Sequence, residues 1–157
     1  LIAENYLKLK TDLPAYRYRE LILAKIGNDQ QLDWCVKIPK YQSDNAAFSY
    51  KYISNNEDHL LVYNDFPGNI DLSVNEYPKV IKEYSKGVLM ACNIDNIDGS
   101  LQKEIALDLS LYKNQKLKPI NPTKAIYDLG NNHFVLINSS YNGGFLLFGL
   151  KHTKSDN

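Results

Sequence analysis

The chain has 157 residues, and its 18 basic and 18 acidic side chains give a formal net charge of zero. This length is typical of one domain, so we expect residues 1–157 to form a single domain with its own core. A composition of 44% hydrophobic and 23% charged residues excludes a disordered or fibrous protein. The charges balance, and Arg17 and Arg19 are the only arginines. Both facts argue against a nucleic-acid partner, because phosphate binding needs an excess of cations.

The longest apolar run, residues 145–150, is much shorter than the roughly 20 residues of a membrane-spanning helix, so we expect no membrane span. The chain begins with Leu1, which indicates that a leader was removed or that the first residues are missing. A cytoplasmic and an exported location therefore both stay open. Cys35 and Cys92 are compatible with one disulfide bond or with two free thiols.

The N-terminal residues 1–10 predict a short amphipathic helix. Ile2, Tyr6 and Leu9 are spaced as on one helix face, and Pro14 follows the segment.

Residues 16–38 predict a β-hairpin. The segment 32–38 alternates apolar and polar side chains, a shorter apolar run covers 20–26, and a turn sequence, 27–30, separates them. A helix over 15–26 is the competing interpretation, because many of its residues are good helix formers.

Residues 48–66 predict a second hairpin, which turns at 55–58. A helix is expected over 77–86, since Pro78 suits the first helical turn and Gly87 suits a C-terminal cap. The segment 88–94 then predicts a strand, although an uncapped helix running on to Cys92 has the same apolar spacing.

The C-terminal part predicts further strands over 104–111, 125–129, 133–138 and 145–150, separated by turn sequences. Together these elements predict an α+β domain, made mainly of an antiparallel sheet of hairpins. The N-terminal helix and the one internal helix would pack on a face of that sheet.

Aromatic and acidic side chains are the candidate binding residues. Phe48, Tyr50 and Tyr52 share one predicted strand face, and tyrosine is favoured where a ring is buried against a partner. Residues 51–100 carry 4 basic and 8 acidic side chains. Several of these acids, including Asp65, Asp95 and Asp98, fall in or beside predicted turns, and they predict an acidic rim.

No catalytic residue, metal site or cofactor site is predicted. His59, His133 and His152 are too far apart in sequence for a ligand motif, and no phosphate-binding glycine loop or nucleophile elbow occurs. Residues 95–99 resemble part of a calcium loop but lack carboxylates at its first and twelfth positions. We expect a hairpin turn there instead, with positive φ supplied at Asp98-Gly99.

The function expected from these observations is non-catalytic binding to another protein. A small bacterial inhibitor or immunity-type protein fits this description, and so does an accessory subunit of a secretion or surface assembly. One alternative is a carrier that holds a small apolar ligand in a curved sheet. A second alternative is a metal-free, ribonuclease-like hydrolase that uses two of the histidines as acid and base.

Overall fold

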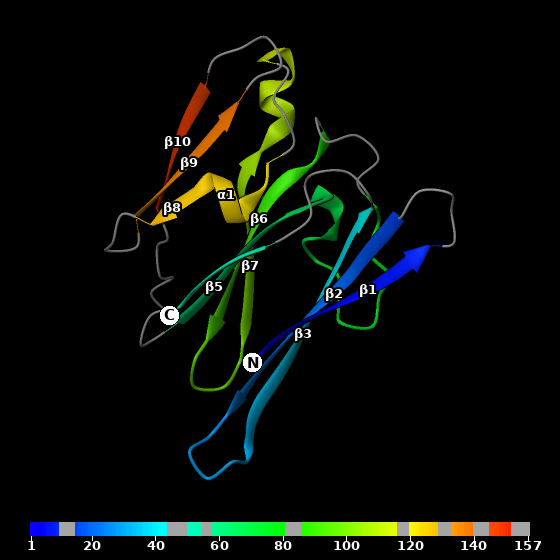
Figure 1. The fold of residues 1–157 in the computed structure, drawn as a ribbon, viewed down its shortest axis with the longest axis vertical. Coiled ribbons are helices and arrows are strands. Elements are labelled where there is room, and N and C mark those ends of the chain that lie inside the picture. Colours follow the sequence, from blue (N-terminus) through cyan, green and yellow to red (C-terminus); the bar gives the residue numbers. More distant parts are fainter. Residues whose placement is uncertain are drawn as a thin grey trace.

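The computed structural model describes residues 1–9, 15–43, 50–54, 58–80, 86–115, 120–128, 133–139 and 145–151. In these residues the chain is mostly strand, arranged as three antiparallel sheets (Figure 1). The N-terminal sheet has the order β1-β2-β3, with bounds Ile2–Leu9, Ala15–Ile26 and Leu32–Ser43.

The central sheet has the order β4-β5-β6-β7. Its strands are Tyr50–Ser54, Asp58–Asp65, Val88–Asp95 and Leu101–Asp108. The C-terminal sheet has the order β10-β9-β8, and its strands in chain order are β8 Ile126–Asp128, β9 His133–Ser139 and β10 Phe145–Lys151.

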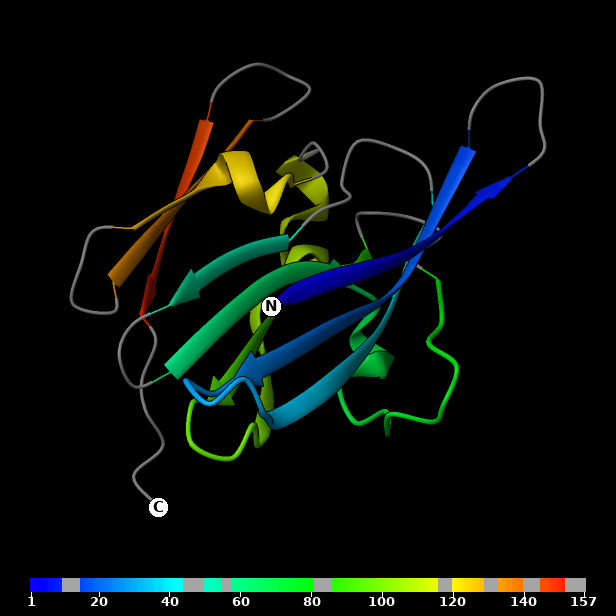
Figure 2. The same cartoon turned by 60° about the horizontal axis from the view of Figure 1, so that its bottom comes forward.

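The central sheet lies between the other two, which makes three layers (Figure 1, Figure 2). Side chains that point to opposite faces of β5 and β6 enter two different apolar clusters. The cluster toward the N-terminal sheet consists of Leu21, Leu23, Trp34, Ile38, Leu61, Tyr63, Val88, Met90, Cys92 and Ile94. The cluster toward the C-terminal sheet consists of Leu60, Val62, Leu89, Ala91, Leu107, Leu109, Ile120, Ala125, Ile126, Phe134 and Leu136.

β6 is buried on both faces from Val88 to Cys92. This burial explains its nearly continuous apolar sequence, because a strand covered on one side only would alternate with polar residues. The three layers share these clusters through one central sheet, which fits a single domain.

The expected α+β fold with an N-terminal helix is wrong. Ile2–Leu9 is strand β1 and pairs along its length with β2. A helix this short is only marginally stable on its own. Pairing with β2 instead provides hydrogen bonds for the backbone and places Glu4 beside Lys40.

The internal helix expected over 77–86 is also absent from the part of that range that the structure describes. Residues 77–80 are irregular, Lys86 lies in a short 3-10 turn, and 81–85 lie outside the described residues. The Asn69 side chain bonds both backbone groups of Lys79, with Lys79 N to Asn69 Oδ1 at 2.9 Å and Asn69 Nδ2 to Lys79 O at 2.8 Å. The bond to Lys79 O occupies a carbonyl that a helix beginning at Pro78 would use for its own first turn.

The described helical elements are short: η1 Pro67–Asn69, η3 Leu109–Gln115 and α1 Pro122–Ala125. None of them covers a sheet face as the α+β prediction required, because other sheets cover both faces of the central sheet. None of the helices in the described part of the chain is long and apolar enough to cross a bilayer.

Most of the predicted strands are confirmed. Residues 16–38 lie within the hairpin of β2 and β3, so the helical alternative for 15–26 is wrong. The second hairpin is formed by β4 and β5, and 88–94 belongs to β6 instead of a helix. The expected turn after β6 is present, and Gly99 has a positive φ of 74°.

Candidate binding site

The predicted aromatic residues lie at the layer between the central and N-terminal sheets. Tyr50 packs against the apolar cluster, and burial, followed by the charge of Glu4, raises the pKa of its hydroxyl. Tyr52, two residues along β4, lies at the rim with 37% of its side chain exposed. Phe48 lies outside the described residues. Of the face that was expected to meet a partner, Tyr50 is therefore partly covered, whereas Tyr52 stays exposed.

The three predicted acids are not brought together. Asp65 ends β5 beside Val88, whereas Asp95 lies at the other end of β6 and pairs with Asp58. Asp95 and Asp98 stabilise one turn, because their Oδ1 atoms accept from Ile97 N at 2.6 Å and from Ser100 N at 2.7 Å. Hydrogen bonding to Ser100 also lowers the pKa of Asp98.

Asp65 is fully buried, unlike the exposed acid expected from its place beside a turn. Its Oδ1 accepts from Phe66 N and from Asn69 Nδ2, both at 2.8 Å. Oδ2 has no hydrogen-bond partner among the described residues. Burial raises the pKa of Asp65 from 3.8 to about 7, against the opposing effects of these hydrogen bonds and of the charges of Lys103 and Lys40.

Lys40 is a second buried charged group in the same layer. Its ammonium donates to Glu4 Oε1 and, at 2.9 Å, to Gln42 Oε1. Burial lowers the pKa of Lys40, and the charge of Glu4 partly offsets this effect. Neither Lys40 nor Asp65 is among the residues that line the two clefts described below.

One surface hollow surrounds His59 and is called here the His59 cleft. It has a volume of about 270 Å³ and is lined by Trp34, Tyr52 and Asn96, among others. His59 Nδ1 lies 2.8 Å from the Tyr52 hydroxyl, and Nε2 lies 3.1 Å from Asn96 Oδ1. A neutral ring with Nε2–H donating to Asn96 and Nδ1 accepting from Tyr52 satisfies both contacts.

The two histidines that the structure describes, His59 and His133, lie on different sheets. His59 is on β5 of the central sheet, His133 begins β9 of the C-terminal sheet, and His152 lies outside the described residues. Among the described residues, no group of three or more His, Cys, Asp or Glu side chains is arranged to hold a metal ion.

The two cysteines are not bonded to each other. Cys35 is exposed, whereas Cys92 is buried in the apolar cluster beside the Tyr63 hydroxyl. Burial raises the pKa of the Cys92 thiol to about 12, so this thiol is poorly nucleophilic in the folded protein.

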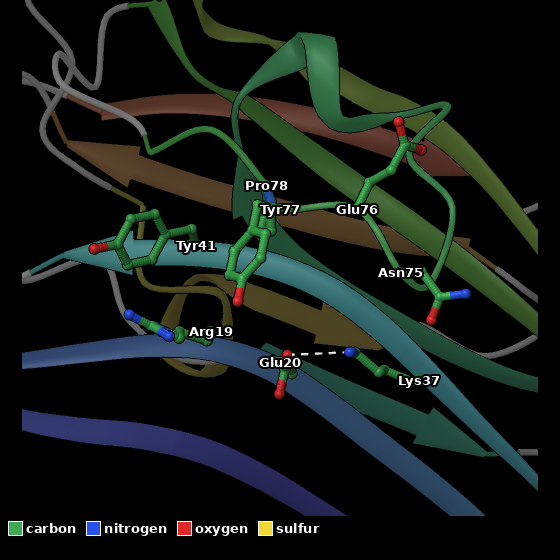
Figure 3. Close-up of a pocket in the computed structure, with 8 residues that line it drawn as sticks. All are labelled: Arg19, Glu20, Lys37, Tyr41, Asn75, Glu76, Tyr77 and Pro78. Atoms are coloured by element: carbon green, nitrogen blue, oxygen red, sulfur yellow. Dashed lines mark ion pairs between the residues drawn. The ribbon is translucent and has the colours of Figure 1, made fainter.

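A second hollow, called here the Arg19 cleft, lies on the outer face of the N-terminal sheet and has a volume of about 210 Å³ (Figure 3). β2 and β3 supply its floor, and the segment 75–78 supplies the facing wall. The lining residues are Arg19, Glu20, Lys37, Tyr41, Asn75, Glu76, Tyr77 and Pro78. Tyr77 projects toward the floor, and its side chain is 87% exposed.

Arg19 reaches this cleft because of an irregularity in β2. The pairing of β2 with β1 and with β3 passes directly from Tyr18 to Glu20, so Arg19 is skipped on both sides. Regular alternation would point Arg19 to the same face as Leu21 and Leu23, which are buried against the central sheet. The bulge instead turns the guanidinium to the outer face, a common effect of β-bulges at functional sites.

Two contacts organise the floor of the Arg19 cleft. The Arg19 guanidinium lies 5.9 Å from the centre of the Tyr41 ring, within the range of a cation–π contact. Lys37 Nζ lies 3.2 Å from Glu20 Oε1. A hydrogen bond from Asn5 and the proximity of Lys37 lower the pKa of Glu20, so this acid stays ionised at neutral pH.

The wall of the Arg19 cleft is anchored to the buried acid. Asp65 holds Asn69, and Asn69 holds the backbone of Lys79, which follows Tyr77 and Pro78 directly. The wall begins at a separate turn, in which Ser73 N donates to Glu76 Oε2 at 2.8 Å. The position of Tyr77 therefore depends on contacts that reach the layer between two sheets.

The sequence interpretation did not find the Arg19 cleft. Alternation along β3 places Tyr41 on the outer face together with Cys35 and Lys37, and this signal was available in the sequence. The exposure of Arg19 depends on a bulge that no residue pattern indicates. Tyr77 was assigned to the start of a helix, which concealed its role in the wall.

Comparison with known proteins gives no assignment. No protein-family model, curated protein or solved structure matches this chain.

Proposed function

We propose that this protein binds another protein and that the Arg19 cleft is part of the contact surface. The observation that carries this proposal is the placement of Tyr77, which is 87% exposed and faces Tyr41 and Arg19 across the cleft. A partner would bury this ring between an arginine and a second tyrosine.

The residue types of the cleft support a protein partner. Tyrosine and arginine are enriched among the residues that dominate binding energy at protein interfaces. The Tyr77 ring contributes little to the stability of the fold, because most of it is exposed to water. Binding of a partner would bury this apolar surface. The anchored wall limits the motion of Tyr77, so less entropy would be lost when a partner docks.

Neither of the two clefts described above has the size expected for the carrier alternative. The two clefts measure about 210 and 270 Å³. Sites for small molecules usually span about 300–1,000 Å³. The two apolar clusters pack into the spaces between the sheets.

The contacts of His59 favour a structural role over catalysis. Both ring nitrogens already have partners, and the imidazole joins β4, β5 and the turn after β6. A general base would need one nitrogen directed at a substrate.

Photocrosslinking at position 77 tests the proposal. A photoreactive phenylalanine analogue replaces Tyr77 in the full chain, which is produced in its own source organism and irradiated. We expect one dominant adduct with a second protein, because this side chain would lie inside the interface.

Position 127 provides the matched control. Tyr127 is also an exposed tyrosine, at 50%, but it lies on β8 of the C-terminal sheet. The same analogue at position 127 should give no adduct of that mass. Equal adducts at both positions, or none at position 77, would overturn the assignment of this surface. Tyr41→Ala should reduce the adduct at position 77 without lowering the melting temperature by more than a few degrees.

A further inference from the structure

We infer that the Arg19 cleft accepts a carboxylate side chain, carried by an extended segment of the partner protein. This inference rests on the proposed function and specifies the chemistry of that partner. The guanidinium of Arg19 is the group that would bind the carboxylate, with the rings of Tyr41 and Tyr77 on either side (Figure 3).

The Arg19 guanidinium forms no close ion pair within the described part of the chain, although its charge acts on Glu20 and helps to lower the pKa of that acid. No carboxylate among those residues lies within ion-pair distance of Arg19. The guanidinium lies 5.9 Å from the centre of the Tyr41 ring, and this contact leaves the donors in the plane of the guanidinium available. Planar arginine donors match the two oxygens of a carboxylate.

Both acids that line the cleft are engaged by other groups. Glu20 pairs with Lys37 and also accepts from Asn5 Nδ2 at 3.1 Å. Glu76 points away from the floor and accepts from Ser73 N. The lining thus carries two cations, Arg19 and Lys37, and two acids, Glu20 and Glu76, and neither acid occupies the donors of the Arg19 guanidinium.

This charge count favours a carboxylate over a phosphate. A carboxylate brings one negative charge beside the two acids of the lining, whereas a phosphate group would bring close to two and would be repelled more strongly. The flanking tyrosines and Pro78 present flat apolar surface, which suits the neighbouring side chains of an extended peptide.

A pair of peptides that differ in one group tests the inference. The probes are acetyl-Gly-Val-Glu-Val-Gly-amide and the same peptide with Gln in place of Glu. Each is titrated into the 15N-labelled full chain and followed by amide chemical shifts. We expect shifts at Arg19, Tyr41 and Tyr77 with the Glu peptide, and binding at least about fivefold weaker with the Gln peptide, as for a partly exposed ion pair.

Two variants assign the effect to one side chain. Arg19→Gln removes the guanidinium and should reduce binding of the Glu peptide to the level of the Gln peptide. Lys124→Gln removes an exposed cation from α1, near the C-terminal sheet, and should leave both titrations unchanged. Amide spectra of the two variants without peptide confirm that each one folds.

The outcomes separate this inference from the proposed function. Equal binding of the two peptides, or no shift around Arg19, overturns the carboxylate assignment. Tighter binding of inorganic phosphate than of the Glu peptide at the same cleft overturns it as well. If the adduct at position 77 persists unchanged in the Arg19→Gln chain, the proposal of protein binding is supported. The inference that Arg19 binds a carboxylate of the partner is then wrong.

Discussion

The two interfaces of the central sheet differ in the polar groups that they bury. Toward the C-terminal sheet, the apolar cluster is accompanied by neutral amides, such as Asn64, whose Nδ2 donates to Ile120 O at 2.7 Å. Toward the N-terminal sheet, the apolar cluster is accompanied by Lys40 and Asp65, which are both fully buried. The first interface is thus held by burial of apolar surface, whereas the second also depends on ionisation.

The difference bears on function, because only the second interface is connected to the Arg19 cleft. Asp65 holds Asn69, and Asn69 fixes the backbone next to Pro78. We expect the stability contributed by the apolar interface to be independent of pH. The charged interface positions the proposed binding surface.

The largest effect is expected from Leu89→Ala in the neutral interface. Leu89 is fully buried on β6 and belongs to the cluster under the C-terminal sheet. The change should lower the free energy of unfolding by about 2–5 kcal/mol, since it removes buried methyl groups and leaves a cavity. Urea denaturation measures this loss, which should be the same at about pH 5 and about pH 8. A loss that varies with pH would contradict the neutral character of this interface.

Asp65→Asn should have the next largest effect, and it should depend on pH. The folded-state pKa of Asp65, about 7, lies above its ordinary value of 3.8. Between these values the folded chain keeps a proton that the unfolded chain releases, so the free energy of unfolding falls as pH rises from about 4 to about 7. The variant should therefore be more stable than the wild type by about 2–4 kcal/mol at about pH 8, and less so near pH 5.

Asp98→Asn is the control for this prediction, because Asp98 is exposed in a turn and its pKa is lowered. Titrating groups distant from the substituted residue contribute equally to the wild type and to each variant, so they cancel in the difference, whereas Lys40 and Lys103 interact with Asp65. The high pKa of Asp65 would be refuted if Asp65→Asn and the wild type had parallel stability profiles between about pH 5 and about pH 8.

A smaller effect is expected where the turn after β6 meets the N-terminal sheet. Gly99 has a φ of 74°, and a Cβ there would lie 2.8 Å from the Trp34 ring. Gly99→Ala should cost about 1–3 kcal/mol, from the left-handed backbone and the close contact. Gly149→Ala on β10 meets nothing within 4 Å and should be neutral or slightly stabilising in thermal melts. Equal melting temperatures for the two variants would mean that the turn can move away from Trp34.

The smallest effect should come from Tyr52→Phe at the rim of the same interface. This change removes the hydroxyl that lies 2.8 Å from His59 Nδ1 and keeps the ring. The expected loss is about 0.5–1 kcal/mol, because the bond is partly exposed to water. Chemical denaturation measures it, and the His59 ring signals in NMR should shift at the same time. A loss in the free energy of unfolding above about 2 kcal/mol would show that the Tyr52 hydroxyl stabilises the fold more than its exposure implies.

Local patterns in the sequence predicted most strands but not the layers. The alternation in 32–38 and the turn at 27–30 identified the first hairpin, because the pairing partners are close in sequence. The apolar run of β6 was recognised as a strand, yet a second sheet on its other face follows only from contacts between distant residues. The expected covering helix was therefore assigned to residues that form irregular structure or a strand.

The failure at residues 1–10 and 77–80 has a common physical cause. In both segments local spacing favoured a helix, while a distant side chain or strand offered the backbone better partners. Glu4 meets Lys40 across the N-terminal sheet, and Lys79 meets Asn69. The Arg19 cleft could not be predicted for the same reason, because it requires a bulge in β2 and a wall held from outside its own sequence.

β6 supplies side chains to both apolar clusters at once. Neither outer sheet can detach without exposing one side of this strand to water, and loss of the strand would leave both outer sheets without a surface to cover. Melting should therefore be all-or-none, with the amide protons of β6 the last to exchange with deuterium.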